Sequence, residues 1–139
     1  MCCGTLLSPL LEVDVANWAL IIAIEDYPKM AGNFSNTLPG TIQSAHDFLE
    51  WVTTVKSVPA ANVVACAGAA YAWRTTGTTR REILDAFTEI VTKSRYAADE
   101  LYVFFSGHGI GFSKDPNDPA IDVLVGSDFV NPAASGGGI

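Results

Sequence analysis

Basic residues are scarce in this chain. Its 139 residues include 8 Lys and Arg against 15 Asp and Glu, which gives a net charge of −7 and an isoelectric point near 4.5. Affinity for nucleic acid irrespective of sequence comes from clustered Lys and Arg that displace counterions from phosphates. The charge balance therefore argues against a nucleic acid partner.

Long apolar runs and paired cysteines are also missing. The longest apolar run, Trp18 to Ile24, is far shorter than the roughly 18 residues needed to cross a bilayer, so no membrane partner is expected. No basic residue precedes the short apolar patch at the N-terminus, which makes a poor secretory signal. The 3 cysteines, Cys2, Cys3 and Cys66, give neither a disulfide framework nor a CxxC metal motif. We expect a reducing, cytoplasmic setting.

What the chain does contain is an alternation of strand and helix patterns. Continuous apolar runs predict strands at 17–24, 62–66 and 101–105, with a further strand or hairpin arm at 121–125. Apolar residues at a 3.6-residue period predict helices at 41–55 and 79–95, and Thr79 with Glu82 matches a capping box at the start of the second. This order predicts an α/β fold: a doubly wound, mostly parallel sheet with helices on both faces.

The length fits one globular domain or part of one. We expect a leader at 1–16, a partial domain at 17–130 that is incomplete at its C-terminal side, and a Gly-rich tail at 131–139.

Polar residues follow two of the predicted strands. Glu25 and Asp26 follow the first strand, and His108 follows the third inside a Gly-rich turn, Ser106 to Gly111. If the strand order is 2-1-3, both groups lie in one crevice at the carboxyl ends of the strands, where ligands bind in open α/β sheets. The imidazole can act as a general base and an adjacent amide as an oxyanion donor. The alternative is that His108 is an ordinary loop residue.

Five segments, taken in order, resemble one family. They are 19–27 (ALIIAIEDY), 38–45 (LPGTIQSA), 79–84 (TRREIL), 102–109 (YVFFSGHG) and 124–128 (LVGSD). Together they resemble the large-subunit half of caspase-like cysteine peptidases, closest to the bacterial, metacaspase-type branch. The resemblance implies a caspase-like fold, peptide or protein substrates, and hydrolysis through a Cys-His dyad. It implies that His108 is the catalytic histidine and that the Gly109 amide forms part of the oxyanion hole.

The chain departs from the family pattern at the nucleophile. In caspases the cysteine follows the histidine by about 50 residues, whereas this chain stops at Ile139. Cys66 ends a predicted strand and is expected to be a small buried hydrophobe. We expect the nucleophile in a C-terminal small-subunit portion and expect no activity from this chain alone. The alternative is a non-catalytic, caspase-fold interaction or scaffold module.

A second departure concerns the substrate pocket. Metacaspase-like relatives carry an Asn-Asp pair whose Asp helps hold a basic P1 side chain, and the matching residues are Gln43 and Ser44. Asp26 is a further substrate-binding candidate, although loop carboxylates are usually just solvated.

No metal site or cofactor is expected. His46 and His108 have no carboxylate at ligand spacing. Some metacaspases are activated by calcium, but the acidic turn at 115–118 lacks the spacing of a calcium loop.

Three further expectations follow from position alone. His46 lies on the polar face of the first helix and is expected to be exposed without a role. Trp73, in a loop between Ala72 and Arg74, is a candidate for partner contact. If the third strand normally pairs with a later one, residues 101–105 form an exposed apolar edge.

Overall fold

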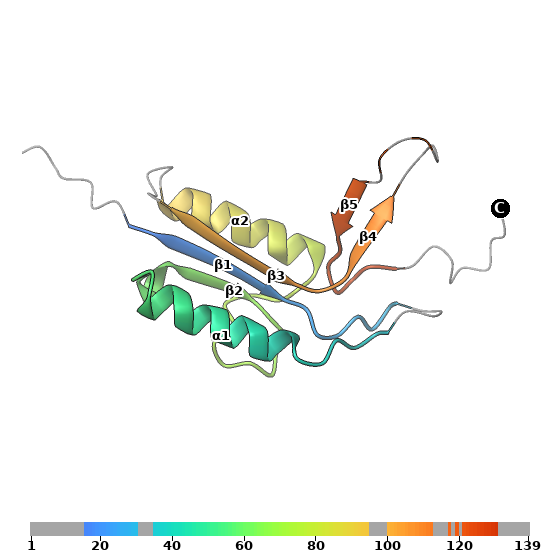
Figure 1. The fold of residues 1–139 in the computed structure, drawn as a ribbon, viewed down its shortest axis with the longest axis horizontal. Coiled ribbons are helices and arrows are strands. Elements are labelled where there is room, and N and C mark those ends of the chain that lie inside the picture. The colour runs from blue at the N-terminus through green and yellow to red at the C-terminus, as the bar shows by residue number, and fades with distance from the viewer. Residues whose placement is uncertain are drawn as a thin grey trace, which may run out of the picture.

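A parallel three-stranded sheet lies at the centre of the chain (Figure 1). The computed structural model describes residues 16–30, 35–94, 100–112, 117, 119 and 121–130, so the predicted tail and nearly all of the predicted leader lie outside the described residues. The strands are β1 (Trp18–Ala23), β2 (Val63–Cys66) and β3 (Leu101–Ser106), in the order β2-β1-β3. β1 pairs parallel with both neighbours, so the condition under which the two polar groups share one end of the sheet is met.

Two helices cover opposite faces of the sheet (Figure 1). Alternate residues of β1 pack in opposite directions, which is why its apolar run shows no alternation and all six residues are buried. One face packs against α2 (Arg80–Ser94) through Ala86 and Ile90, and the other against α1 (Thr41–Thr54) through Ala45. A single turn of 3-10 helix, Ala60–Asn62, precedes β2. The predicted α/β architecture is confirmed.

The two helices begin differently. Gly40, with φ of 89°, lies in the left-handed region just before α1, where a glycine avoids the Cβ penalty. At α2, the Thr79 amide donates to Glu82 Oε2 at 3.0 Å and the Glu82 amide donates to Thr79 Oγ1 at 3.3 Å, which confirms the predicted capping box. Thr79 Oγ1 also donates to Glu82 Oε2 at 2.6 Å, and the hydrogen bonds from Thr79 hold the pKa of Glu82 below its usual value.

The Gly-rich segment after β3 differs from the prediction. Only Gly107 and His108 form the turn, because β3 runs through Ser106 and β4 (Gly109–Phe112) then pairs antiparallel with β5 (Ile121–Leu124). The prediction of one continuous turn to Gly111 is wrong, since backbone pairing with β5 stabilises an extended conformation that glycines adopt as readily as a turn. The hairpin arm predicted at 121–125 is confirmed.

Trp73 is partly buried and packs against the cluster on the α1 side of the sheet, with its ring 6.0 Å from that of Tyr71. Its role in partner contact stays a prediction.

β3 lies at the edge of the sheet within the described part of the chain. Leu101 and Val103 are 44% and 50% exposed, which confirms the predicted apolar edge. Within the same described residues, no helix is long and apolar enough to cross a membrane.

Candidate active site

The residues that follow β1 and β3 meet at one end of the sheet. Ala23 pairs with Ser106, and the next amide, Ile24 N, donates to the Ser106 carbonyl at 2.9 Å. The Glu25–Tyr27 segment therefore lies beside Gly107 and His108. The order β2-β1-β3 thus brings the two polar groups together, as expected if the strands are arranged 2-1-3.

The ring of His108 is held by a backbone carbonyl. Its Nε2 lies 2.8 Å from the carbonyl oxygen of Ser35. Because a carbonyl oxygen only accepts hydrogen bonds, Nε2 must carry the proton and donate. In a neutral imidazole the other nitrogen, Nδ1, is then the unprotonated acceptor. The geometry thus assigns the basic nitrogen to Nδ1.

The backbone of His108 is held as well. Its amide donates to the hydroxyl of Tyr27 at 2.7 Å, and its carbonyl accepts from the Val125 amide at 3.2 Å. The Tyr27 hydroxyl in turn donates to the Val125 carbonyl at 3.2 Å. Tyr27 is fully buried, and burial raises the pKa of its hydroxyl, which therefore stays protonated at neutral pH.

A short ribbon joins Tyr27 to Ser35. Leu38 N donates to the Glu25 carbonyl and Tyr27 N to the Asn36 carbonyl, both at 2.8 Å, and Asp26 forms an antiparallel bridge with Thr37. This ribbon brings the Ser35 carbonyl to His108. Sequence reasoning missed both contacts. The available signal for Tyr27 was a tyrosine a few residues after a buried strand. Ser35 acts through its backbone carbonyl, so its side chain gave no signal.

The amide of Gly109 points away from the hairpin. Val125 N donates to the His108 carbonyl just before the Gly109–Leu124 pair. Since hydrogen-bonded and non-hydrogen-bonded pairs alternate along an antiparallel ladder, Gly109 and Leu124 do not exchange backbone hydrogen bonds. The Gly109 N–H is therefore directed away from β5.

The two predicted substrate-binding residues lie on different elements. Asp26 is exposed and belongs to the ribbon itself, next to Tyr27. Ser44 is exposed on the first turn of α1, where its hydroxyl donates to the Gly40 carbonyl at 3.1 Å. Within the described residues, neither side chain hydrogen-bonds to His108. The adjacent Glu25 accepts from the Tyr71 hydroxyl at 2.6 Å, which raises the pKa of Tyr71.

Cys66 is not suited to be a nucleophile. Its side chain is fully buried, and burial, followed by the charges of Glu82 and Glu89, raises the pKa of its thiol to about 12. A thiol with that pKa is ionised to roughly one part in 10⁵ at neutral pH, and only the thiolate attacks. This agrees with the expectation of a small buried hydrophobe. The described residues also contain no group of three His, Cys, Asp or Glu side chains able to hold a metal ion.

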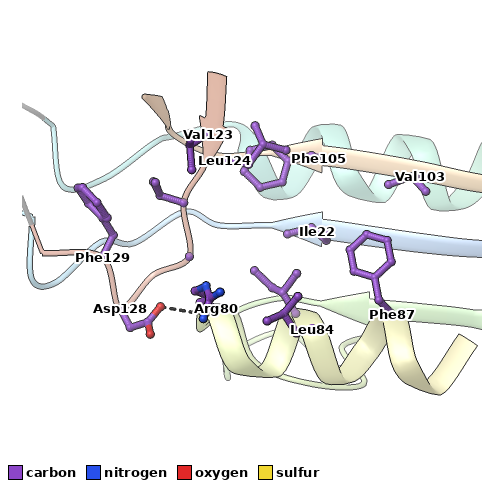
Figure 2. Close-up of a pocket in the computed structure, with 13 residues that line it drawn as sticks. Ile22, Arg80, Leu84, Phe87, Val103, Phe105, Val123, Leu124, Asp128 and Phe129 are labelled. Atoms are coloured by element: carbon purple, nitrogen blue, oxygen red, sulfur yellow. Dashed lines mark hydrogen bonds between the residues drawn. The ribbon is translucent and has the colours of Figure 1, made fainter. Parts of the chain in front are cut away.

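An apolar groove of about 510 Å³ runs beside the free edge of β3 (Figure 2). Leu84 and Phe87 of α2 form one wall, Val103 and Phe105 of β3 another, and the end of the β4–β5 hairpin closes it. At that end Asp128 Oδ1 accepts from the Arg80 amide at 2.8 Å, so the segment after β5 is tied to the start of α2.

The fold and site define an α/β protein with a histidine-centred site at the carboxyl end of a parallel sheet. The sequence matches the profile of the caspase domain, a peptidase family, over residues 16–129, and the chain belongs to this family. It is also similar to a probable protease of a Desulfuromonadales bacterium, with 29% identity over 122 residues. That match covers 73% of this chain and 14% of the relative, so the chain spans about a seventh of that protein's length.

Proposed function

We propose that this chain is the histidine-bearing half of a cysteine endopeptidase domain that cleaves peptide or protein substrates. The single observation that carries the proposal is the Nε2–Ser35 hydrogen bond, because it leaves Nδ1 of His108 as a proton acceptor at the carboxyl end of the sheet. Membership of the caspase domain family supports the same reaction class.

The proposed reaction has two stages. Nδ1 of His108 takes the proton of a cysteine thiol, and the sulfur adds to the scissile carbonyl carbon while the carbonyl becomes an oxyanion. The Gly109 N–H donates to that oxyanion, a contact typically worth about 10²–10³ in rate. The C–N bond then breaks, and His108 returns the proton to the leaving amine. Water, deprotonated by His108, adds to the thioester and releases the acid and the thiol. No metal or cofactor is needed for these steps.

We propose that the cysteine comes from a C-terminal small-subunit portion. A further strand running parallel to β3 along its free edge would end beside His108, because the carboxyl ends of parallel strands meet at one edge of a sheet. The apolar groove next to that edge offers the surface such a portion would cover. Since Cys66 is buried with a raised pKa, the chain alone is expected to be inactive.

Asp26 and Ser44 remain our candidates for substrate binding. Asp26 belongs to the same ribbon as Ser35, whose carbonyl contacts His108, and this shared element supports the assignment. Replacing Asp26 with Asn should lower kcat/KM for peptides with Lys or Arg at P1 more than for peptides with Asp at P1. An equal fall in kcat/KM for all three kinds of peptide would show that Asp26 does not bind the P1 side chain.

The proposed function is tested with His108→Ala and a matched histidine control. Intact mass first establishes whether the natural polypeptide continues past Ile139 with a cysteine about 50 residues after His108. In that polypeptide, His108→Ala should abolish peptide hydrolysis, whereas His46→Ala, on the exposed face of α1, should not change it. Retained hydrolysis by His108→Ala would contradict the proposal, and inactivity of the unsubstituted polypeptide would favour the non-catalytic interaction module.

A further inference from the structure

We propose that Tyr27 is a positioning residue that fixes the backbone of His108 in its catalytic orientation. The inference rests on the proposed function, since it assigns a second residue to the same site. Tyr27 contacts neither substrate nor reacting atoms in this account and acts through His108 alone.

The Tyr27 hydroxyl both accepts and donates a hydrogen bond. It accepts from the His108 amide at 2.7 Å and donates to the Val125 carbonyl at 3.2 Å. Val125 in turn donates to the His108 carbonyl at 3.2 Å, so both peptide groups of His108 are tied to the same pair of residues. A phenylalanine would fill the same space with neither hydrogen bond, leaving buried polar groups without their partner.

The ring of Tyr27 also contacts the imidazole. The two ring centroids are 4.7 Å apart with an interplanar angle of 63°, an edge-to-face arrangement. The ribbon that holds Tyr27 N on the Asn36 carbonyl is the one that presents Ser35 to Nε2. Thus the amide, the ring and the ring nitrogen of His108 are all contacted by the paired segments 25–27 and 35–38.

Gly107 allows this close approach. A Cβ at this position would lie 2.5 Å from the Tyr27 hydroxyl oxygen and 2.9 Å from the ring of Phe105. Real Cβ atoms essentially never show either separation, so a side chain here would force the Tyr27 hydroxyl, the Phe105 ring or the turn itself to shift and would disturb the contact with the His108 amide. Gly107→Ala therefore tests the same contact while keeping the tyrosine.

The experiment compares Tyr27→Phe with two controls in the complete enzyme. Tyr102→Phe removes an exposed hydroxyl bound to Glu100 at the opposite end of β3, and Val52→Ala destabilises the core on the α1 side without touching the site. We expect Tyr27→Phe to lower kcat by about 10- to 100-fold, because a displacement of about 1 Å at a catalytic group costs rates of this size. KM should change by less than about threefold. Both controls should keep the kcat of the unsubstituted enzyme.

Amide hydrogen exchange gives a readout that does not depend on catalysis. Tyr27→Phe should speed exchange at the His108 amide by about tenfold or more while the amides of β1 remain protected. A general loss of stability would speed exchange at the His108 amide and at the β1 amides alike. Val52→Ala, which destabilises the core, shows what that pattern looks like. If Tyr27→Phe does not fold, Gly107→Ala should show the same fall in kcat.

The outcomes separate this inference from the proposed function. Unchanged kcat in a folded Tyr27→Phe or Gly107→Ala variant, with His108→Ala inactive, would overturn the positioning role and leave the peptidase assignment intact. An active His108→Ala variant would overturn the peptidase assignment itself. Faster exchange at His108 together with a loss of kcat that Val52→Ala does not share would support the positioning role.

Discussion

At the residue scale, the contact between Nε2 of His108 and the Ser35 carbonyl selects one tautomer of a half-buried imidazole. The tautomer matters because it determines which ring nitrogen can take a proton from a thiol. His108 and Gly109 could be proposed from sequence, since the histidine follows an apolar strand and is flanked by glycines. Ser35 could not, because a backbone carbonyl has no residue preference and the segment reads only as a polar loop.

Cys66 provides a prediction at the same scale. Because its thiol is buried and has a raised pKa, we predict that iodoacetamide at pH 8 does not alkylate Cys66 in the native chain. In the urea-unfolded chain, the reagent should alkylate it. Peptide mapping by mass spectrometry separates Cys66 from Cys2 and Cys3. Cys66→Ala should cost about 1 kcal/mol of stability and leave peptidase activity unchanged. Rapid native alkylation, or loss of activity in a folded Cys66→Ala variant, would contradict the assignment.

At the scale of elements, the start of α2 depends on the Glu82 carboxylate. The pKa of Glu82 is lowered on folding, mainly by its hydrogen bonds from Thr79. A lowered folded-state pKa stabilises the protein above the unfolded-state value, near 4.3, and this contribution is lost as the pH falls through the folded-state pKa. Glu82→Gln should therefore cost about 0.5–1 kcal/mol at pH 7, a modest value because the carboxylate is partly solvated.

Chemical denaturation from pH 7 to pH 3 checks this prediction. The difference between the unsubstituted chain and Glu82→Gln should shrink across the acid range. Asp85→Asn is the matched control, because Asp85 is exposed on the same helix and makes only a 3.7 Å ion pair with Arg81. A Glu82 effect that is independent of pH, or no larger than that of Asp85→Asn, would argue against the capping role.

A second prediction at this scale concerns the junction between β5 and α2. A Cβ on Gly126 would lie 2.5 Å from the Arg80 amide nitrogen and 2.8 Å from Asp128 Oδ1, the two atoms of the hydrogen bond that ties the segment after β5 to the start of α2. Gly126→Ala should cost about 1–3 kcal/mol in the thermal or chemical unfolding of the chain. Gly68→Ala is the control, since its Cβ would meet only the Tyr71 ring at 3.5 Å. Equal free energies of unfolding for the two variants would show that the junction accommodates the added methyl group without cost.

The elements differ in how far the sequence predicts them. The 3.6-residue period and the Thr79–Glu82 pair predict both helices, and the unbroken run at Trp18 predicts the buried central strand. The β4 strand was missed because Gly-Ile-Gly carries a turn-like composition, and only its pairing with β5 stabilises the extended form. Local pattern cannot reveal a partner strand that pairs through backbone atoms.

At the scale of the whole molecule, the groove beside β3 is expected to determine whether the chain self-associates in solution. Its apolar walls and the exposed edge at Leu101 and Val103 predict concentration-dependent association of the chain alone. The melting temperature should rise when the C-terminal portion is added. Val103→Lys should abolish that rise, whereas Val55→Lys, at the end of α1, should keep it. A clean monomer by sedimentation with no change in melting temperature would count against this interface.

The central claim is that His108 activates a cysteine outside the residues of this chain, and covalent labelling tests it most directly. A peptidyl chloromethyl ketone should alkylate the complete polypeptide once, and mass spectrometry should place the adduct on a cysteine beyond Ile139. His108→Ala should abolish the labelling, and His46→Ala should leave it unchanged. An adduct on Cys66, or labelling that persists in His108→Ala, would contradict the account.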